Sequence, residues 1–164
     1  MSPPVTPRRH RDLALALVTA VVAFGVLWPI YQHLVRHGDS RPYPWRDVTG
    51  RIGPLQLPRP SGRLFHSQRD LARYFEAAVP GRKAPRVRFT GREALLVAAG
   101  PRSSTGYSVH IVSVTEQRSR ILVRAQEQTP ALGDAVRPAV SSPYRLITFP
   151  ASGKPVFLDW EGRS

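Results

Sequence analysis

Residues 107–129 read YSVHIVSVTEQRSRILVRAQEQT, and this stretch decides the fold. Its two halves are rich in Val, Ile and Leu, and the short polar piece 116–119 separates them. In the second half, Ile121, Val123 and Ala125 alternate with Leu122 and polar residues, which is typical of a strand with one buried face and one wet face. The stretch therefore predicts an antiparallel hairpin with a four-residue loop, at the centre of a sheet.

Further strand-like runs surround this hairpin. They are enriched in Val, Ile, Leu and aromatic residues, and glycines and prolines separate them, as in a small antiparallel sheet. With the hairpin strands included, the runs cover residues 94–99, 107–115, 120–129, 144–149 and 155–160.

A single principal helix precedes these strands. Ser67 can cap its first turn, with Asp70 three residues on, and apolar residues recur at helical spacing from Leu71 to Val79. Pro80 and Gly81 end the pattern. One helix with a mainly antiparallel sheet predicts the α+β class.

The N-terminus has a different character. Residues 1–12 form a basic tail, and residues 13–31 follow without one charge, which is close to the ~20 helical residues that cross a bilayer. The run ends in Trp28, Pro29 and Tyr31 instead of a small-residue cleavage site, so a single-pass anchor is favoured over a signal peptide. A core helix is disfavoured because no polar face interrupts the run. Basic residues flanking a span stay in the cytoplasm, which predicts an extracytoplasmic C-terminal domain at the cell membrane.

Between anchor and domain, residues 32–60 are rich in proline, glycine and arginine and show no sustained apolar period. We expect a partly extended stalk there and one globular domain over residues 61–164. The chain has no cysteine, which excludes disulfides and lipidation at cysteine.

The net charge of +13 comes mostly from arginine. An external location and the absence of a basic run interleaved with aromatic residues exclude nucleic acid as a partner. The arginines are expected to be dispersed over a solvated surface, where anionic lipid or wall polymer would attract them.

Residues 95–150 contain four short motifs in this order: a turn before a tyrosine, the hairpin, a Pro-x-x-Gly turn and a Pro-Tyr pair. The turn before the tyrosine is Ser104, Thr105, Gly106 and Tyr107, and the later turn holds Pro130 and Gly133. Val136, Ala139, Pro143 and Tyr144 complete the pattern. This region resembles the C-terminal domain of the PrcB family, named for an accessory subunit of a bacterial surface protease complex. The family commonly has two glycines before the tyrosine, where this chain has Thr105 and Gly106.

The resemblance implies an external, sheet-rich module that is associated with proteolysis or the cell surface. It implies a protein partner such as a surface protease, and it implies no catalytic residue. Members are often lipoproteins, whereas this chain has no cysteine to modify.

A second, local resemblance concerns the same turn. Residues 104–107 are similar to the loop with which chagasin-type inhibitors occupy cysteine peptidases. The alternative is a tight turn in which Gly106 supplies an unusual backbone angle and Tyr107 enters the core. The inhibitor hypothesis requires an exposed loop at a sheet end, flanked by a second loop such as residues 132–136.

Residues for catalysis are sparse. The domain has only His66 and His110, and no G-x-S-x-G motif, phosphate loop or paired-carboxylate motif occurs. No histidine pair with helical spacing or cysteine ligand is available within it for a metal. We therefore predict no enzyme activity, no cofactor and no metal.

The prediction for function is a membrane-anchored, extracytoplasmic, protein-binding domain that assists or stabilises a surface protease or envelope complex. Alternatives are a peptidase inhibitor and a structural envelope protein that binds anionic polymer or lipid. Recognition is expected in two loops. The candidate binding residues are Ser104, Thr105, Gly106, Tyr107, Pro130, Leu132, Gly133 and Asp134.

Overall fold

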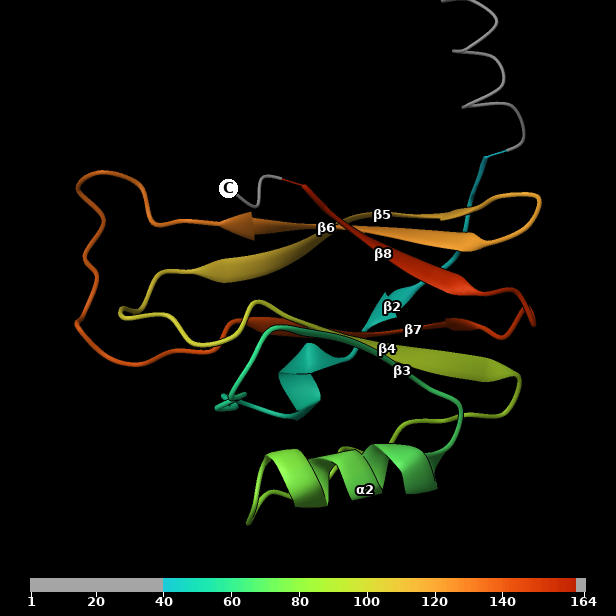
Figure 1. The fold of residues 1–164 in the computed structure, drawn as a ribbon, viewed down its shortest axis with the longest axis horizontal. Coiled ribbons are helices and arrows are strands. Elements are labelled where there is room, and N and C mark those ends of the chain that lie inside the picture. The colour runs from blue at the N-terminus through green and yellow to red at the C-terminus, as the bar shows by residue number, and fades with distance from the viewer. Residues whose placement is uncertain (1–39, 162–164) are drawn as a thin grey trace, which may run out of the picture. The chain divides into compact units, whose positions relative to one another are not determined.

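A computed structural model describes residues 40–161 of the chain. In this part, eight strands and one α-helix surround two hydrophobic cores (Figure 1). The elements, in chain order, are β1 (Arg41–Pro42), β2 (Arg46–Asp47), the 3-10 helix η1 (Thr49–Arg51), β3 (Ser61–Phe65), α2 (Gln68–Ala78), β4 (Arg92–Ala98), β5 (Ser108–Glu116), β6 (Ile121–Gln128), β7 (Tyr144–Pro150) and β8 (Val156–Glu161).

The strands form two sheets instead of the single sheet predicted. One sheet has the order β1-β5-β6-β8 and the other has the order β2-β7-β4-β3. In Figure 1 the second sheet lies between the first sheet and α2. The residues of β4 account for the second layer. Glu93–Ala98 are all buried, because one face of this strand packs toward α2 and the other toward the first sheet.

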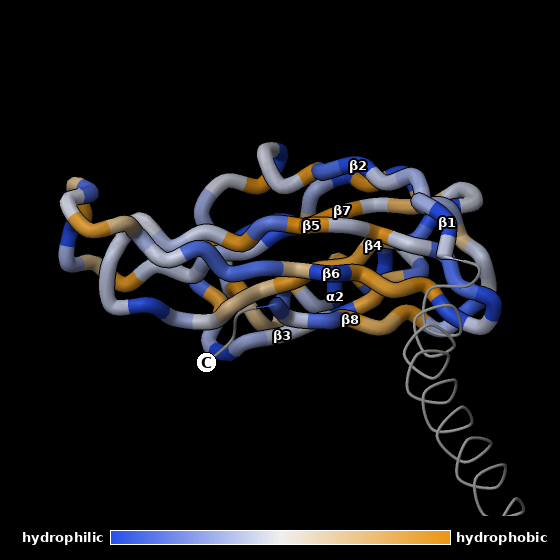
Figure 2. Tube along the Cα trace, turned by 90° about the horizontal axis from the view of Figure 1, so that it is seen from above, coloured by the Kyte–Doolittle hydropathy of each residue, from blue (hydrophilic) through white to orange (hydrophobic). Residues whose placement is uncertain are grey.

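Two cores fill the spaces on either side of the middle sheet. Ala94, Leu96 and Ala98 of β4 pack with Leu71 and Phe75 of α2. The alternate residues, among them Leu95 and Val97, pack with the inner face of the β1-β5-β6-β8 sheet. Figure 2 shows hydrophobic residues running along the central strands. The alternate residues of the apolar run in β4 thus belong to the two different cores.

The predicted hairpin is confirmed. β5 and β6 pair antiparallel from Ser108↔Gln128 to Glu116↔Ile121, with a β-bulge between Ile111 and Ser113. The Gln117 amide donates to the Arg120 carbonyl at 2.8 Å, so the loop lies one residue later than predicted. β5 and β6 are the two inner strands of their sheet, and Ile121, Val123 and Ala125 of β6 are buried.

The predicted helix is also confirmed. Ser67 is the N-cap of α2, and its side chain accepts a hydrogen bond from the Asp70 amide at 3.1 Å. Leu71 and Phe75 are fully buried, one turn apart on the face toward β4. This amphipathic face fixes α2 against the middle sheet.

One pairing departs from the antiparallel pattern. β8 pairs parallel to β6, from Ile121↔Val156 to Gln126↔Glu161. Between these two strands the chain leaves their sheet, forms β7 in the middle sheet, and returns. Strand direction was not evident from the sequence of residues 155–160, since both directions bury the same alternate side chains.

Residues 40–60, predicted as part of a stalk, belong to the compact unit, which begins at Ser40 instead of residue 61. β1 pairs with β5 and β2 pairs with β7, although each strand has only two residues. Leu55 and Leu57 are buried in the core under α2. The prolines of this segment disrupt regular secondary structure without preventing burial of its leucines.

Within residues 40–161, no helix is long and apolar enough to cross a membrane. The predicted anchor, residues 13–31, lies outside the described residues, as do the basic tail, residues 1–12, and residues 32–39.

Candidate functional site

The two loops predicted to bind a partner lie side by side at one end of the domain. The first loop, residues 101–107, lies in the connection between β4 and β5, and the second, residues 129–143, connects β6 to β7. The Thr105 amide donates to the Arg137 carbonyl at 3.0 Å, and the Arg137 amide donates to Thr105 Oγ1 at 2.9 Å. Ser141 Oγ donates to the Ser104 carbonyl at 2.7 Å. Ser104 and Thr105 therefore hold the second loop in place.

Gly106 makes this close approach possible. Its φ is +97°, in the region that favours glycine. A Cβ atom at this position would lie 2.8 Å from Val136 Cγ1 and 3.0 Å from Pro130 Cβ. Gly106 thus has the unusual backbone angle predicted for the turn, and it lies directly against the second loop.

The tip of the second loop is a self-contained turn. The Ala131 amide donates to Asp134 Oδ2 at 2.7 Å, and the Asp134 amide donates to the Ala131 carbonyl at 3.1 Å. Gly133, with φ +95°, has open space around it. This hydrogen bonding leaves the Leu132 side chain, 107% exposed, at the tip.

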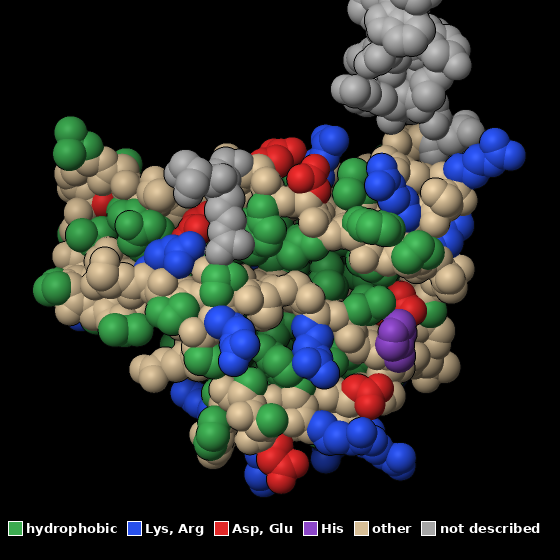
Figure 3. Space-filling view, viewed as in Figure 1, with side chains coloured by type: hydrophobic (Ala, Val, Ile, Leu, Met, Phe, Trp, Pro, Cys, Tyr) green, Lys and Arg blue, Asp and Glu red, His purple; other side chains and the backbone are tan. Residues whose placement is uncertain are grey.

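Leu132 is not the only exposed apolar side chain of the second loop. Val136 is 41% and Val140 is 68% exposed. In Figure 3, hydrophobic side chains gather at the left end of the molecule, where this loop lies in Figure 1, while basic side chains are spread over several elements. The second loop thus presents three aliphatic side chains to solvent.

An ion pair fastens the start of the first loop to β6. Arg102 donates through Nε to Glu127 Oε1 at 2.5 Å and through Nη2 to Glu127 Oε2 at 2.6 Å. The hydrogen bond to Glu127 raises the pKa of Arg102, although burial opposes the shift. The guanidinium carbon lies 5.9 Å from the centre of the Tyr107 ring. Arg102 therefore connects β6 to the ring of Tyr107.

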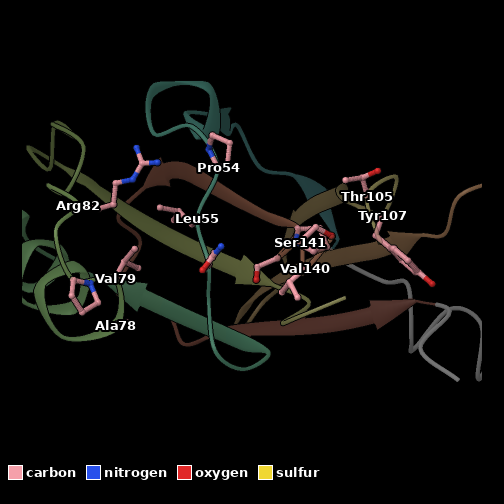
Figure 4. Close-up of a pocket in the computed structure, with 13 residues that line it drawn as sticks. Pro54, Leu55, Ala78, Val79, Arg82, Thr105, Tyr107, Val140 and Ser141 are labelled. Carbon is pink, nitrogen blue, oxygen red and sulfur yellow. The ribbon is translucent and has the colours of Figure 1, made fainter. Parts of the chain in front are cut away.

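Tyr107 does not enter either core, contrary to the prediction for a simple tight turn. It is half-buried and lines a groove of about 620 Å³. Figure 4 shows Thr105, Tyr107, Val140 and Ser141 on one side of this groove, Val79 and Arg82 on the other, and Pro54 and Leu55 between them. The groove thus joins the two loops to the end of α2 and to the segment before β3.

The sequence did not point to the groove residues outside the loops. Pro54, Leu55, Gln56 and Arg82 lie far from the loops in sequence, and only the folded chain brings them together. A second hollow of about 310 Å³ shares Pro54, Tyr107, Ser142 and Pro143 with the groove. Of the predicted binding residues, Thr105 and Tyr107 line the groove, while Leu132, Gly133 and Asp134 form the tip of the second loop.

The two histidines of the domain each lie beside one polar side chain. His110 Nε2 lies 2.8 Å from Ser108 Oγ on the exposed part of β5, and no carboxylate within residues 40–161 bonds to His110. His66 Nδ1 lies 3.0 Å from Glu93 Oε1. Within the same residues, no three His, Asp or Glu side chains are placed to hold a metal ion.

The region between β4 and β7 matches a known family. Residues 94–150 match the PrcB C-terminal family. The PrcB C-terminal match includes most of β4, both loops, the β5-β6 hairpin and β7, and it confirms the resemblance found in the sequence. No curated protein and no solved structure matches the chain.

Proposed function

We propose that this chain is a non-enzymatic protein-binding subunit that assists or stabilises a surface protease or envelope complex. The observation that supports it most is that the PrcB C-terminal match contains both braced loops. The first loop holds the second, and the second presents Leu132, Val136 and Val140 to solvent. Binding by complementarity needs a rigid surface with exposed apolar anchors, which these loops supply.

The absence of enzymatic activity is part of the proposal. A serine hydrolase needs a histidine that a carboxylate orients and donors for an oxyanion. The Ser108–His110 pair is exposed on a strand, and His110 bonds no carboxylate in the described part of the chain. Ser108 and His110 are two residues apart on β5, so their side chains lie on the same face of the strand and contact each other without a catalytic role.

The proposed location is the outer side of the cell membrane, with residues 13–31 as the anchor and the N-terminus in the cytoplasm. The charge-free run and the preceding basic residues support this orientation. Carbonate extraction of membranes tests the anchor, and protease treatment of intact cells tests the side on which the domain lies. Extraction of the intact chain into the soluble fraction would contradict the anchor.

The test of partner binding is a crosslinked pull-down of the full-length chain from its native membranes, with the partners identified by mass spectrometry. We expect a protease or its accessory subunits. Leu132→Asp should reduce their recovery, because it places a charge at the apolar tip without disturbing packing.

Val112→Asp is the matched control. Val112 is 49% exposed in the β5 bulge, outside both loops, and the substitution adds the same charge. Recovery should stay as in the parent chain. Equal loss in both variants, or recovery of lipid and wall polymer alone, would overturn the proposal and favour a structural envelope protein.

A peptidase inhibitor is the second candidate, because residues 132–136 flank residues 104–107 as that hypothesis requires. The full chain in detergent would be assayed against papain. Inhibition that disappears in the Thr105→Ala/Tyr107→Ala variant, while the variant still unfolds cooperatively, would favour this candidate. Unaffected papain activity would exclude it for this class of peptidase.

A further inference from the structure

The segment 54–57 has the pattern of a strand without a partner. Leu55 and Leu57 are buried, while Gln56 between them is exposed, which is the alternation of an extended strand. Leu57 accepts a hydrogen bond from Ser142 Oγ at 3.3 Å. Within residues 40–161, the backbone N–H and C=O groups of Leu55 and Gln56 make no hydrogen bond.

Unpaired backbone groups matter here because Leu55 and Gln56 line the 620 Å³ groove. A backbone N–H or C=O group that is removed from water needs a hydrogen-bond partner. An extended peptide supplies such a partner by adding a strand, and pockets along the strand then select side chains. Apolar lining from Val79, Val140 and Pro143 provides surface for alternate side chains of the peptide.

The charge of the groove also indicates which side chain the peptide carries. Arg82 is the only charged residue that lines it, and no Asp or Glu does. In the described residues, Arg82 has neither an ion-pair partner nor a hydrogen bond from its side chain. A single unpaired cation at one side of a groove favours an anionic group nearby.

We propose that this groove binds an extended segment of a partner protein, which adds a strand alongside residues 54–57 and places an acidic side chain against Arg82. The inference rests on the proposed function, since it specifies the chemistry of the protein partner. It assigns main-chain recognition to Leu55 and Gln56, and charge selection to Arg82.

The test is NMR titration of the ¹⁵N-labelled full chain in lipid nanodiscs with two capped hexapeptides, Thr-Val-Asp-Val-Thr-Val and its counterpart with Lys for Asp. We expect the Asp peptide to shift the backbone amides of Leu55 and Gln56 and the Arg82 Nε–H. The Lys peptide should bind roughly fivefold more weakly, the upper range for one exposed ion pair.

A variant with the opposite charge at residue 82 tests the role of Arg82 directly. Arg82→Glu should reverse the preference, so that the Lys peptide binds more tightly than the Asp peptide. Arg86→Glu makes the same change of charge at an exposed residue that does not line the groove, and it should leave the preference unaltered. Both positions are exposed, so both variants are expected to fold, and their amide spectra would verify it.

Unchanged Leu55 and Gln56 amides, or equal shifts with both peptides, would overturn the inference. The titration contains no natural partner, so this outcome leaves the pull-down result standing. Conversely, a failed pull-down with a positive titration would overturn the proposed protease association and retain the groove as a peptide site.

Discussion

Tyr144 connects the middle sheet to the segment before β3. Its hydroxyl donates to the Gly53 carbonyl at 2.5 Å, and the residue is 7% exposed. Burial raises the pKa of Tyr144 from 10.0 to about 12, although the nearby Arg145 and Arg82 cations oppose the shift. The neutral phenol is therefore the form that the folded domain stabilises.

This shift predicts loss of stability at alkaline pH. The contribution of Tyr144 is fully present below its unfolded pKa of 10.0 and is lost as pH rises through about 12. Tyr144→Phe should cost about 1 kcal/mol at neutral pH by removing a hydrogen bond, and should flatten this part of the pH profile. Urea unfolding across this pH range measures both effects.

Tyr74→Phe is the control, because in residues 40–161 the Tyr74 hydroxyl makes no hydrogen bond. Tyr74 stacks edge-on against Phe65 at 5.4 Å between ring centres, which the substitution retains. Its alkaline profile should match that of the parent chain. If Tyr144→Phe also matched the parent chain, the assignment of the shift to Tyr144 would fail.

The Arg102–Glu127 pair offers a second residue-scale prediction. Glu127 has a side chain only 10% exposed, so Arg102→Ala leaves a buried carboxylate without its cation. We expect a loss of about 2 kcal/mol in the free energy of unfolding, typical of hydrogen bonds to charged groups. The double variant Arg102→Ala/Glu127→Leu should be more stable than Arg102→Ala alone. Chemical denaturation would contradict this if the double variant lost the sum of the free energies of unfolding that the two single variants lose.

At the scale of elements, α2 stabilises the domain through one face. Leu71→Ala should lower the free energy of unfolding by about 2 to 5 kcal/mol, since a fully buried leucine leaves a cavity. Arg69→Ala, on the exposed side of the same helix, should change it by less than about 0.5 kcal/mol. Thermal and urea unfolding of both variants would refute the packing of α2 if the losses were equal.

The sequence predicts an element well when the element is long enough to show a regular pattern of apolar residues. The hairpin and α2 were predictable because alternation in Ile121–Ala125 and the Ser67 cap are local properties of the chain. β1 and β2 have two residues each, too few to show a period, and their pairing partners lie far along the chain. The second sheet had a local indication in the unbroken apolar run of β4, which signifies burial on both faces.

At the scale of the whole molecule, the domain depends on residues 40–60. Val48, Leu55 and Leu57 belong to the core under α2, and β1 and β2 each extend a sheet. We predict that a chain beginning at Ser40 unfolds cooperatively, whereas a chain beginning at Ser61 does not. Circular dichroism during thermal unfolding would contradict this if both chains gave the same sharp transition.

The sequence predicts only those parts of the candidate site that have a local pattern. The loops around Gly106 and Gly133 were identifiable from turn chemistry, since both glycines adopt positive φ. The groove combines Pro54 and Leu55, the end of α2, Thr105 and Tyr107 with Val140, which are brought together only by the tertiary fold. Arg82 was one of many arginines in the sequence, and only the surrounding groove distinguishes it.

The parallel pair of β6 and β8 constrains how the chain reaches its native state. β8 is the last strand of the described chain, and its neighbour β6 is separated from it by β7, which belongs to the other sheet. Pairing of β8 with β6 therefore makes contacts of long sequence separation, and topologies dominated by such contacts fold in roughly milliseconds to seconds. During synthesis, Val123 and Ala125 stay without their neighbours Leu158 and Trp160 until the final strand emerges. In that interval β6 is an open edge on which a chaperone or a second nascent chain can pair.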